Sequence, residues 1–213
     1  MRVDVFYSMR SPYCYLLTPR LVELSRAPDV EVCVRPVYPL AVRDPGFFQR
    51  TDPLYRPYHL LDSRRLAAFL GIAYRRPVPD PIVQDLRTNE IAPEQPYIRR
   101  LTRLAQAAAE TGCSLAFAEH VMTLLWDGGT DGWDQGDHLA RAVAEAGLDL
   151  AELDAAIEAE PARYDAAIEV HQQAQRRAGH WGVPLMVFED EPFYGQDRFE
   201  LLLWRMRQRG LSI

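Results

Sequence analysis

Cysteine is scarce in this sequence. Only Cys14, Cys33 and Cys113 occur among its 213 residues, and they lie far apart along the chain. They match neither the spacing of a metal-ligand cluster nor a framework of paired disulfides. The pattern therefore predicts a reduced, cytoplasmic protein with no metal site.

Long apolar runs and an excess of positive charge are also missing. No stretch approaches the length of a transmembrane helix, no signal peptide precedes the first predicted strand, and no basic amphipathic face indicates a membrane surface. The net charge of −6 disfavours nucleic acid as a partner. What is present is enough hydrophobic residues, 48% of the chain, to build the core of one sizeable domain.

The first chemistry-bearing residues lie between a predicted strand and a predicted helix. Apolar alternation over residues 2–7 predicts the strand, and helical spacing after Pro12 predicts a helix that ends near Arg26. Ser11 followed by Pro12 is typical of an N-cap and the first helical position. The free N–H groups and the dipole of such a helix start can stabilise a thiolate.

Ser11 and Cys14 share the spacing of a redox Cys-x-x-Cys motif, but the first position carries oxygen. A serine cannot form a mixed disulfide, so on a thiol-handling scaffold the reactive sulfur must come from a ligand. Capping is the ordinary role for Ser11. Cys14 alone is typical of a small buried apolar residue.

The remaining pattern predicts a strand, a long helical block and a final pair of strands with a helix. Asp134 and Asp149 are expected to cap two of the helices. The predicted elements are a strand over 30–37, loops or short turns over 40–57, a helix over 58–70, helices over 97–179, strands over 185–188 and 192–194, and a last helix from 196. No composition break separates two independent domains.

Two further places could contribute to a site. Gly182-Val183-Pro184 precedes the third strand, and a cis bond there would turn the Val183 backbone toward a peptide ligand. Because trans bonds are much commoner, the residues alone favour an ordinary trans proline. Asp197 lies at a second helix start, where capping competes with binding a ligand ammonium.

These motifs together resemble a known family. The run from Ser11 to Leu16 after a strand, Gly182-Val183-Pro184, and Gly195-Gln196-Asp197-Arg198 resemble the 2-hydroxychromene-2-carboxylate isomerases. That family belongs with the kappa-class glutathione transferases in the DsbA superfamily. Residues 58–71 also resemble the family helix that leads into a proline-bearing connector.

The resemblance implies an α/β, thioredoxin-like domain with an all-helical insertion between its second and third strands. The thioredoxin-like part would comprise residues 1–40 and 180–213, and the insertion residues 41–179. Glutathione would bind the backbone of Val183 beside cis-Pro184, with its γ-glutamyl head at Gln196 and Asp197.

In the same reading, Ser11 would hydrogen-bond the glutathione sulfur and raise its thiolate fraction. The thiolate would add reversibly to a conjugated substrate and permit rotation about a former double bond. The family resemblance also favours a homodimer acting on an aromatic or conjugated carboxylate.

The sequence departs from the family near Ser11. Ser8 replaces an acidic residue, Arg10 stands where an apolar residue is common, and Cys14 replaces a second serine. Residues 74–87 do not clearly reproduce an asparagine-bearing stretch that contacts glutathione in the family. Arg10 could attract an anionic substrate or the thiolate, or point to solvent. Further residues expected to line the site are Ser8, Arg10, Tyr13, Cys14 and Trp181.

Three functions follow from these patterns. The first is a glutathione-dependent isomerase or kappa-type transferase in which Ser11 stabilises the thiolate. The second is a thiol-disulfide oxidoreductase-like protein that uses Cys14 as a lone thiol. The third is a non-catalytic thioredoxin-fold binding protein whose cleft holds a peptide, metabolite or partner protein.

Overall fold

Four strands form one mixed sheet in the computed structural model, which describes residues 1–212. They are β1 (Arg2–Tyr7), β2 (Glu31–Pro36), β3 (Leu185–Phe188) and β4 (Glu191–Tyr194). Their order is β2-β1-β3-β4. β1 is parallel to β2 and antiparallel to β3, and β3 and β4 form an antiparallel hairpin. The predicted strand positions are confirmed to within one or two residues.

Helices account for most of the remaining chain. They are α1 (Pro12–Ser25), α2 (Leu40–Arg43), α3 (Phe47–Arg50), α4 (Tyr55–Leu70), α5 (Pro96–Glu110), α6 (Ser114–Trp126), α7 (His138–Glu145), α8 (Leu150–Ala159), α9 (Pro161–Arg177), the 3₁₀ helix η1 (Gln196–Arg198) and α10 (Phe199–Gln208). The expected α/β fold is confirmed, with α2 to α9 all falling between the second and third strands.

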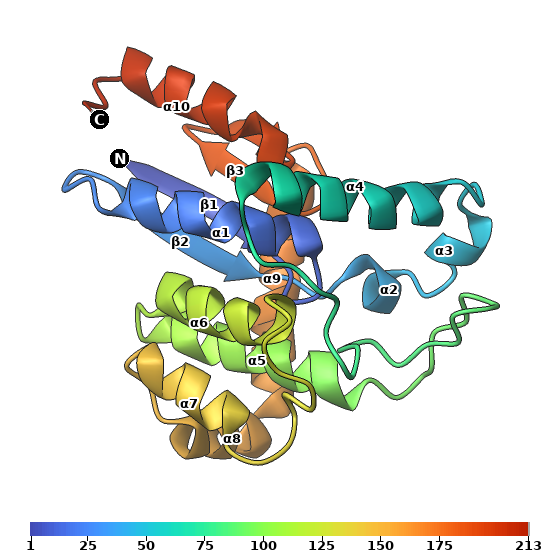
Figure 1. Ribbon diagram of the computed structural model, residues 1–213. Helices are drawn as coiled ribbons and strands as arrows, with labels where there is room; N and C mark the ends of the chain where they lie inside the picture. Colours follow the sequence, from blue (N-terminus) through green and yellow to red (C-terminus); the bar gives the residue numbers. More distant parts are fainter. Residues whose placement is uncertain (213) are drawn as a thin grey trace.

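The long helical segment packs directly on the sheet. α5, α6 and α9 contact β2, whereas α10 contacts β3 and β4 at the other end of the strand order (Figure 1). Side chains from the strands and from α5 to α8 belong to one hydrophobic core. Within residues 1–212, no helix combines the length and apolar character needed to cross a bilayer.

Two helix starts differ from the sequence-based prediction. α4 begins at Tyr55 rather than residue 58, which places Pro57 in the first turn, where no backbone donor is needed. Asp134 does not cap α7, because Gly136 adopts a left-handed conformation and the helix begins only at His138. Asp149 does cap α8, accepting hydrogen bonds from two backbone N–H groups.

A buried hydrogen-bond chain joins β1 to α1. The Thr18 hydroxyl donates to the Cys14 carbonyl at 2.9 Å, so the Tyr7 hydroxyl donates to Thr18 at 2.6 Å. Both Tyr7 and Thr18 are almost fully buried. This connection fixes the first turns of α1 against the end of β1, which is where Ser11 lies.

Thr18→Val should lower the free energy of unfolding by about 2 kcal/mol, because it leaves the buried Tyr7 hydroxyl without a partner. Adding Tyr7→Phe removes that unpaired hydroxyl, so the double variant should be at least as stable as Thr18→Val alone. Urea unfolding of the two single variants and the double variant measures this. Strictly additive losses would contradict the proposed hydrogen bond.

Candidate functional site

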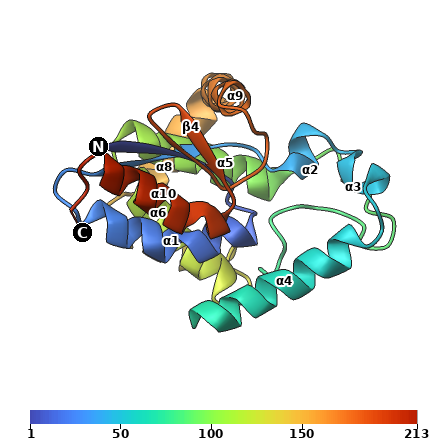
Figure 2. The same ribbon diagram turned by 90° about the horizontal axis from the view of Figure 1, so that it is seen from above.

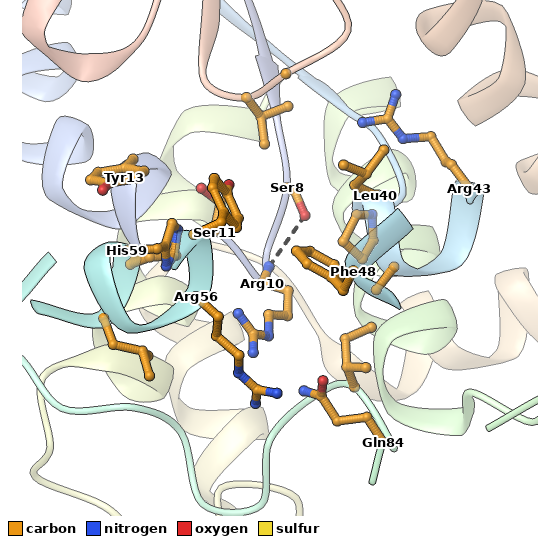
Figure 3. A pocket seen from close by; sticks show the side chains of 18 of the residues that line it. Ser8, Arg10, Ser11, Tyr13, Leu40, Arg43, Phe48, Arg56, His59 and Gln84 are labelled. Carbon is orange, nitrogen blue, oxygen red and sulfur yellow. Dashed lines mark hydrogen bonds between the residues drawn. The ribbon is translucent and has the colours of Figure 1, made fainter. Parts of the chain in front are cut away.

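One pocket lies where the β1–α1 turn, α2, α3, α4, the connector after α4 and the loop before β3 meet. Figure 2 shows α2, α3 and α4 on the same side of the molecule. It has a volume of about 160 Å³. Side chains from these separate segments converge on it (Figure 3). The lining residues are Ser8, Arg10, Ser11, Pro12, Tyr13, Pro39, Leu40, Ala41, Arg43, Phe48, Tyr55, Arg56, His59, Leu60, Arg76, Ile82, Gln84, Asn89, Trp181, Gly182, Val183 and Tyr194.

Ser11 combines the two roles that its sequence context left open. Its Oγ accepts a hydrogen bond from the Cys14 backbone N–H at 3.3 Å and caps α1, while the same side chain lines the pocket. The hydroxyl proton has no acceptor among residues 1–212. Because a hydroxyl carries one donor and two acceptor sites, capping leaves that donor available to a ligand.

The peptide before β3 lies in the same pocket as Ser11. The Val183–Pro184 bond is cis, so the trans assignment favoured by the residues alone was wrong and the conformation implied by the family resemblance is confirmed. Val183 lines the pocket, and within residues 1–212 neither its N–H nor its C=O has a hydrogen-bond partner. Pro184 itself is not a lining residue, and its carbonyl accepts from the Gly195 N–H at 2.9 Å.

The loop carrying Val183 is held by polar contacts from two helices. Gln175, fully buried on α9, donates to the Gly182 carbonyl at 2.7 Å. Arg43 on α2 donates to the Gln175 amide oxygen at 3.2 Å and to the Trp181 carbonyl at 3.0 Å. A Cβ at Gly182 would lie 2.5 Å from the Tyr194 ring, so the close packing here requires glycine.

Arg10 neither points to solvent nor stands alone in the pocket. Its guanidinium binds both carboxylate oxygens of Asp80, at 3.0 and 2.8 Å, and Arg76 binds the same carboxylate at 2.6 Å. Burial alone would raise the Asp80 pKa, but the charge and hydrogen bonds of Arg10 outweigh it and hold that pKa below its usual value. The contact ties the β1–α1 turn to the proline-rich connector after α4.

His59 lies on α4 among aromatic rings. Its ring centroid is 5.1 Å from that of Tyr13 and 5.8 Å from that of Tyr55. Burial, reinforced by the charges of Arg10 and Arg76, lowers the His59 pKa to about 4. Neither ring nitrogen has a hydrogen-bond partner among residues 1–212, so the neutral imidazole can donate one hydrogen bond to a ligand and accept another.

Cys14 is placed where it reacts poorly. It is fully buried, is not a lining residue, and burial raises its thiol pKa to about 12. Cys33 and Cys113 are also free thiols, and neither lines the pocket. No cluster of three or more potential metal ligands occurs in residues 1–212.

Gln196 and Asp197 lie at the start of η1 and outside the pocket lining. The Gln196 side chain accepts a hydrogen bond from Arg20, which also donates to the Gln196 carbonyl at 3.0 Å. Asp197 is exposed and pairs with Arg198 at 2.9 Å. Their assignment to a γ-glutamyl head group stays a prediction.

The structure thus brings six predicted residues to one pocket, and it adds residues that sequence reasoning missed. The predicted ones are Ser8, Arg10, Ser11, Tyr13, Trp181 and Val183. The missed ones include Arg43, Phe48, Tyr55, Arg56, His59, Arg76 and Tyr194. The missed residues lie on the short helices α2 and α3, on α4, in the connector after it and on β4, where local spacing gave no signal for a site.

Comparisons with known proteins agree with this architecture. A family model described as a DSBA-like thioredoxin domain matches residues 2–207. The chain is similar in structure to a 2-hydroxychromene-2-carboxylate isomerase, with 20% identity and a TM-score of 0.67, covering 98% of this chain and 95% of that one. No curated protein matches.

Two oxidoreductase structures are also similar. A probable DsbA oxidoreductase from Streptomyces coelicolor has 20% identity and a TM-score of 0.67, covering 100% of this chain and 92% of that one. The cytosolic disulfide reductase DsbM from Pseudomonas aeruginosa, in a structure with GSH, has 17% identity and a TM-score of 0.57, covering 98% of this chain and 100% of that one. At these identities the likeness shows the fold.

His59→Gln should make the free energy of unfolding fall less steeply as the pH is lowered. Because the folded pKa of about 4 lies below the unfolded value of 6.5, the unfolded chain takes up a proton first as pH falls. His59 therefore favours folding fully above pH 6.5, and this contribution is lost as pH falls toward 4. The wild type should lose up to about 3 kcal/mol more than His59→Gln over this window. Urea unfolding at several pH values measures the difference, and identical slopes would contradict the placement of His59.

Proposed function

Since the chain belongs to the DSBA-like thioredoxin domain family, we propose that it is a glutathione-dependent isomerase or kappa-type transferase acting on an aromatic or conjugated carboxylate. One observation carries the proposal: the Ser11 hydroxyl and the Val183 peptide line the same pocket, each with unused hydrogen-bonding capacity. A hydroxyl donor beside an extended-peptide site suits a thiol tripeptide better than a disulfide substrate.

The pocket fits glutathione at two points and leaves a third open. The free N–H and C=O of Val183 can pair with the backbone of a peptide ligand, as an added strand does. Ser11 can donate to the ligand sulfur at the N-terminus of α1, where the helix dipole favours negative charge. The Gln196 side chain already accepts a hydrogen bond from Arg20. To bind the γ-glutamyl head group together with Asp197, it would have to contact the ligand as well as Arg20.

The proposed chemistry needs little from the protein beyond position and charge. Bound glutathione would supply a nucleophilic thiolate for reversible addition to a conjugated substrate. Ser11 would stabilise the negative sulfur through its free proton, and Val183 would hold the peptide in register. His59, neutral at pH 7, could offer an uncharged hydrogen-bonding partner to the substrate.

Aromatic side chains supply the surface for the substrate. Tyr13, Phe48, Tyr55 and Trp181 all line the pocket. Trp181 also packs against Phe47 of α3, with their ring centroids 5.6 Å apart. A planar conjugated ligand can stack or pack edge-on against such rings. The similarity to a 2-hydroxychromene-2-carboxylate isomerase supports the isomerase form of the proposal.

The oxidoreductase alternative depends on Cys14, and the geometry disfavours it. A lone attacking thiol must be accessible and deprotonated, whereas Cys14 is fully buried with a pKa of about 12. The position that would carry the attacking sulfur is Ser11. A homodimer, expected from the family resemblance, and a cytoplasmic location, expected from the cysteine pattern, remain part of the proposal.

Ser11→Ala should raise the pKa of the bound glutathione thiol and reduce glutathione-dependent isomerisation by about 10- to 100-fold, because a hydrogen bond to a charged group is lost. Ultraviolet absorbance of the thiolate against pH measures the first effect, and turnover of a conjugated carboxylate measures the second.

Ser11→Gly is the matched control for the capping role. Glycine keeps most of the N-cap stability, whereas alanine costs about 1 kcal/mol. Both variants should lose the thiolate effect, and only Ser11→Ala should lose that stability. If glutathione binds the wild type with an ordinary thiol pKa, or if both variants turn over normally, the role of Ser11 is wrong.

A further inference from the structure

The pocket lining carries an imbalance of charge that the thiol site does not explain. Four arginines line it, Arg10, Arg43, Arg56 and Arg76, and none of the lining residues is an aspartate or glutamate. Asp80, just behind the lining, is shared by Arg10 and Arg76. One carboxylate therefore serves two guanidinium groups, while the two other arginines have no acidic partner within residues 1–212.

Arg43 and Arg56 differ in what they do. The two Nη atoms of Arg43 hold Gln175 and the Trp181 carbonyl, so this side chain supports the loop before β3. Arg56 uses only Nη1, which donates to the Asn89 side chain and to the Leu86 carbonyl at 3.4 Å. Its Nε and Nη2 have no partner among residues 1–212 and are not buried, which leaves them available to a ligand.

The free face of Arg56 lies close to the other guanidinium groups. Figure 3 shows the Arg10 and Arg56 side chains next to each other at one end of the pocket, with the Gln84 amide facing them. Burial lowers the Arg56 pKa, and the charges of Arg76 and Arg10 lower it further. The positive charges of the three guanidinium groups repel one another because water screens them only in part at this end of the pocket. An anion bound there would relieve the repulsion.

The chemistry of this end selects a carboxylate. A guanidinium group presents its N–H donors as a planar fork that matches the two oxygens of a carboxylate. The aromatic rings of Tyr13 and Tyr55, which line the same pocket as Arg56 and both pack near His59, suit a flat apolar body attached to that carboxylate.

We propose that Arg56, supported by Arg10 and Arg76, forms the subsite that binds the carboxylate of a planar conjugated ligand. This subsite deepens the proposed function and depends on it for the identity of the reaction, but ligand binding can be measured without turnover. Arg56 is then the residue that selects an anionic substrate over its neutral analogue.

Calorimetry with trans-cinnamate and with cinnamamide tests the subsite, because the two probes differ in charge and share the flat body. The wild type should bind cinnamate at least about 10-fold more tightly than cinnamamide at low salt. Arg56→Gln should abolish this preference while leaving cinnamamide binding unchanged. Arg56→Lys, which keeps the charge and loses the fork, should retain only part of it.

Arg65→Gln is the matched control, since Arg65 is an exposed arginine of α4 outside the pocket lining. It should bind cinnamate as the wild type does. Melting temperatures of all variants exclude unfolding as the cause of a loss. Equal binding of the two probes to the wild type, or equal losses in Arg56→Gln and Arg65→Gln, would overturn the proposal.

A carboxylate of glutathione is the alternative ligand for Arg56. A second experiment distinguishes it from the carboxylate of the substrate. Titrating S-methylglutathione into Arg56→Gln should give wild-type affinity, and cinnamate should still bind when S-methylglutathione saturates the wild type. If Arg56→Gln weakens S-methylglutathione binding and spares cinnamate, the substrate subsite is wrong.

Failure of the proposed function gives a different result from failure of the subsite. A thiol pKa and turnover in Ser11→Ala equal to those of the wild type would reject the thiolate role and leave the Arg56-dependent preference for cinnamate intact. Equal binding of cinnamate and cinnamamide to the wild type, with a thiol pKa that Ser11→Ala still raises, would reject the subsite and leave the thiolate role standing.

Discussion

The Arg10–Asp80 ion pair holds the candidate site together. It joins the turn that presents Ser11 to a connector 70 residues further along the chain, and Arg76 adds a second cation to the same carboxylate. All three side chains are largely shielded from water, so removal of Asp80 would leave two partly buried cations uncompensated. The same contact that places the connector thus creates the positive end of the pocket.

In the pocket, the arginines stay charged although they are partly buried, and their charge adds to burial in lowering the pKa of a neighbouring histidine. All 24 basic side chains of the chain are arginines, and a guanidinium keeps its charge when it is partly buried, as a lysine amine does not always do. The field of Arg10 and Arg76 in turn helps to keep His59 neutral. The result is a pocket with fixed positive charge, a neutral imidazole and aromatic walls, although the chain as a whole carries a net charge of −6.

Ser11 and Cys14, the two residues at the start of α1 that could take part in thiol chemistry, have opposite surroundings. Ser11 lies at the surface of the pocket with a free proton, whereas Cys14, one turn into the helix, faces the core. Three residues along a helix is almost one full turn, so local spacing brings them close together without deciding which of them is exposed. Under the proposed function, this arrangement leaves the reactive sulfur to be supplied by the ligand.

Local patterns predicted most of the fold, because each depends on a short stretch of chain. Alternation identified β1 and β2, and Ser11-Pro12 and Asp149 marked helix starts whose caps are formed as expected. The two failures have different causes, one local and one not. At Asp134 a left-handed glycine delays the helix, and before β3 the isomer of Pro184 depends on packing that no local rule contains.

The sequence by itself determined the half of the site that is made by backbone motifs, Ser11 at a helix start and Val183 before a strand. Only the tertiary structure decided the other half, Arg56, His59 and Arg76, because no local pattern marks these side chains as site residues and they become neighbours through the packing of α4 and its connector. A helix cap or a turn depends on a few consecutive residues. The charges and the burial that lower the pKa of a histidine come from side chains far apart in the chain.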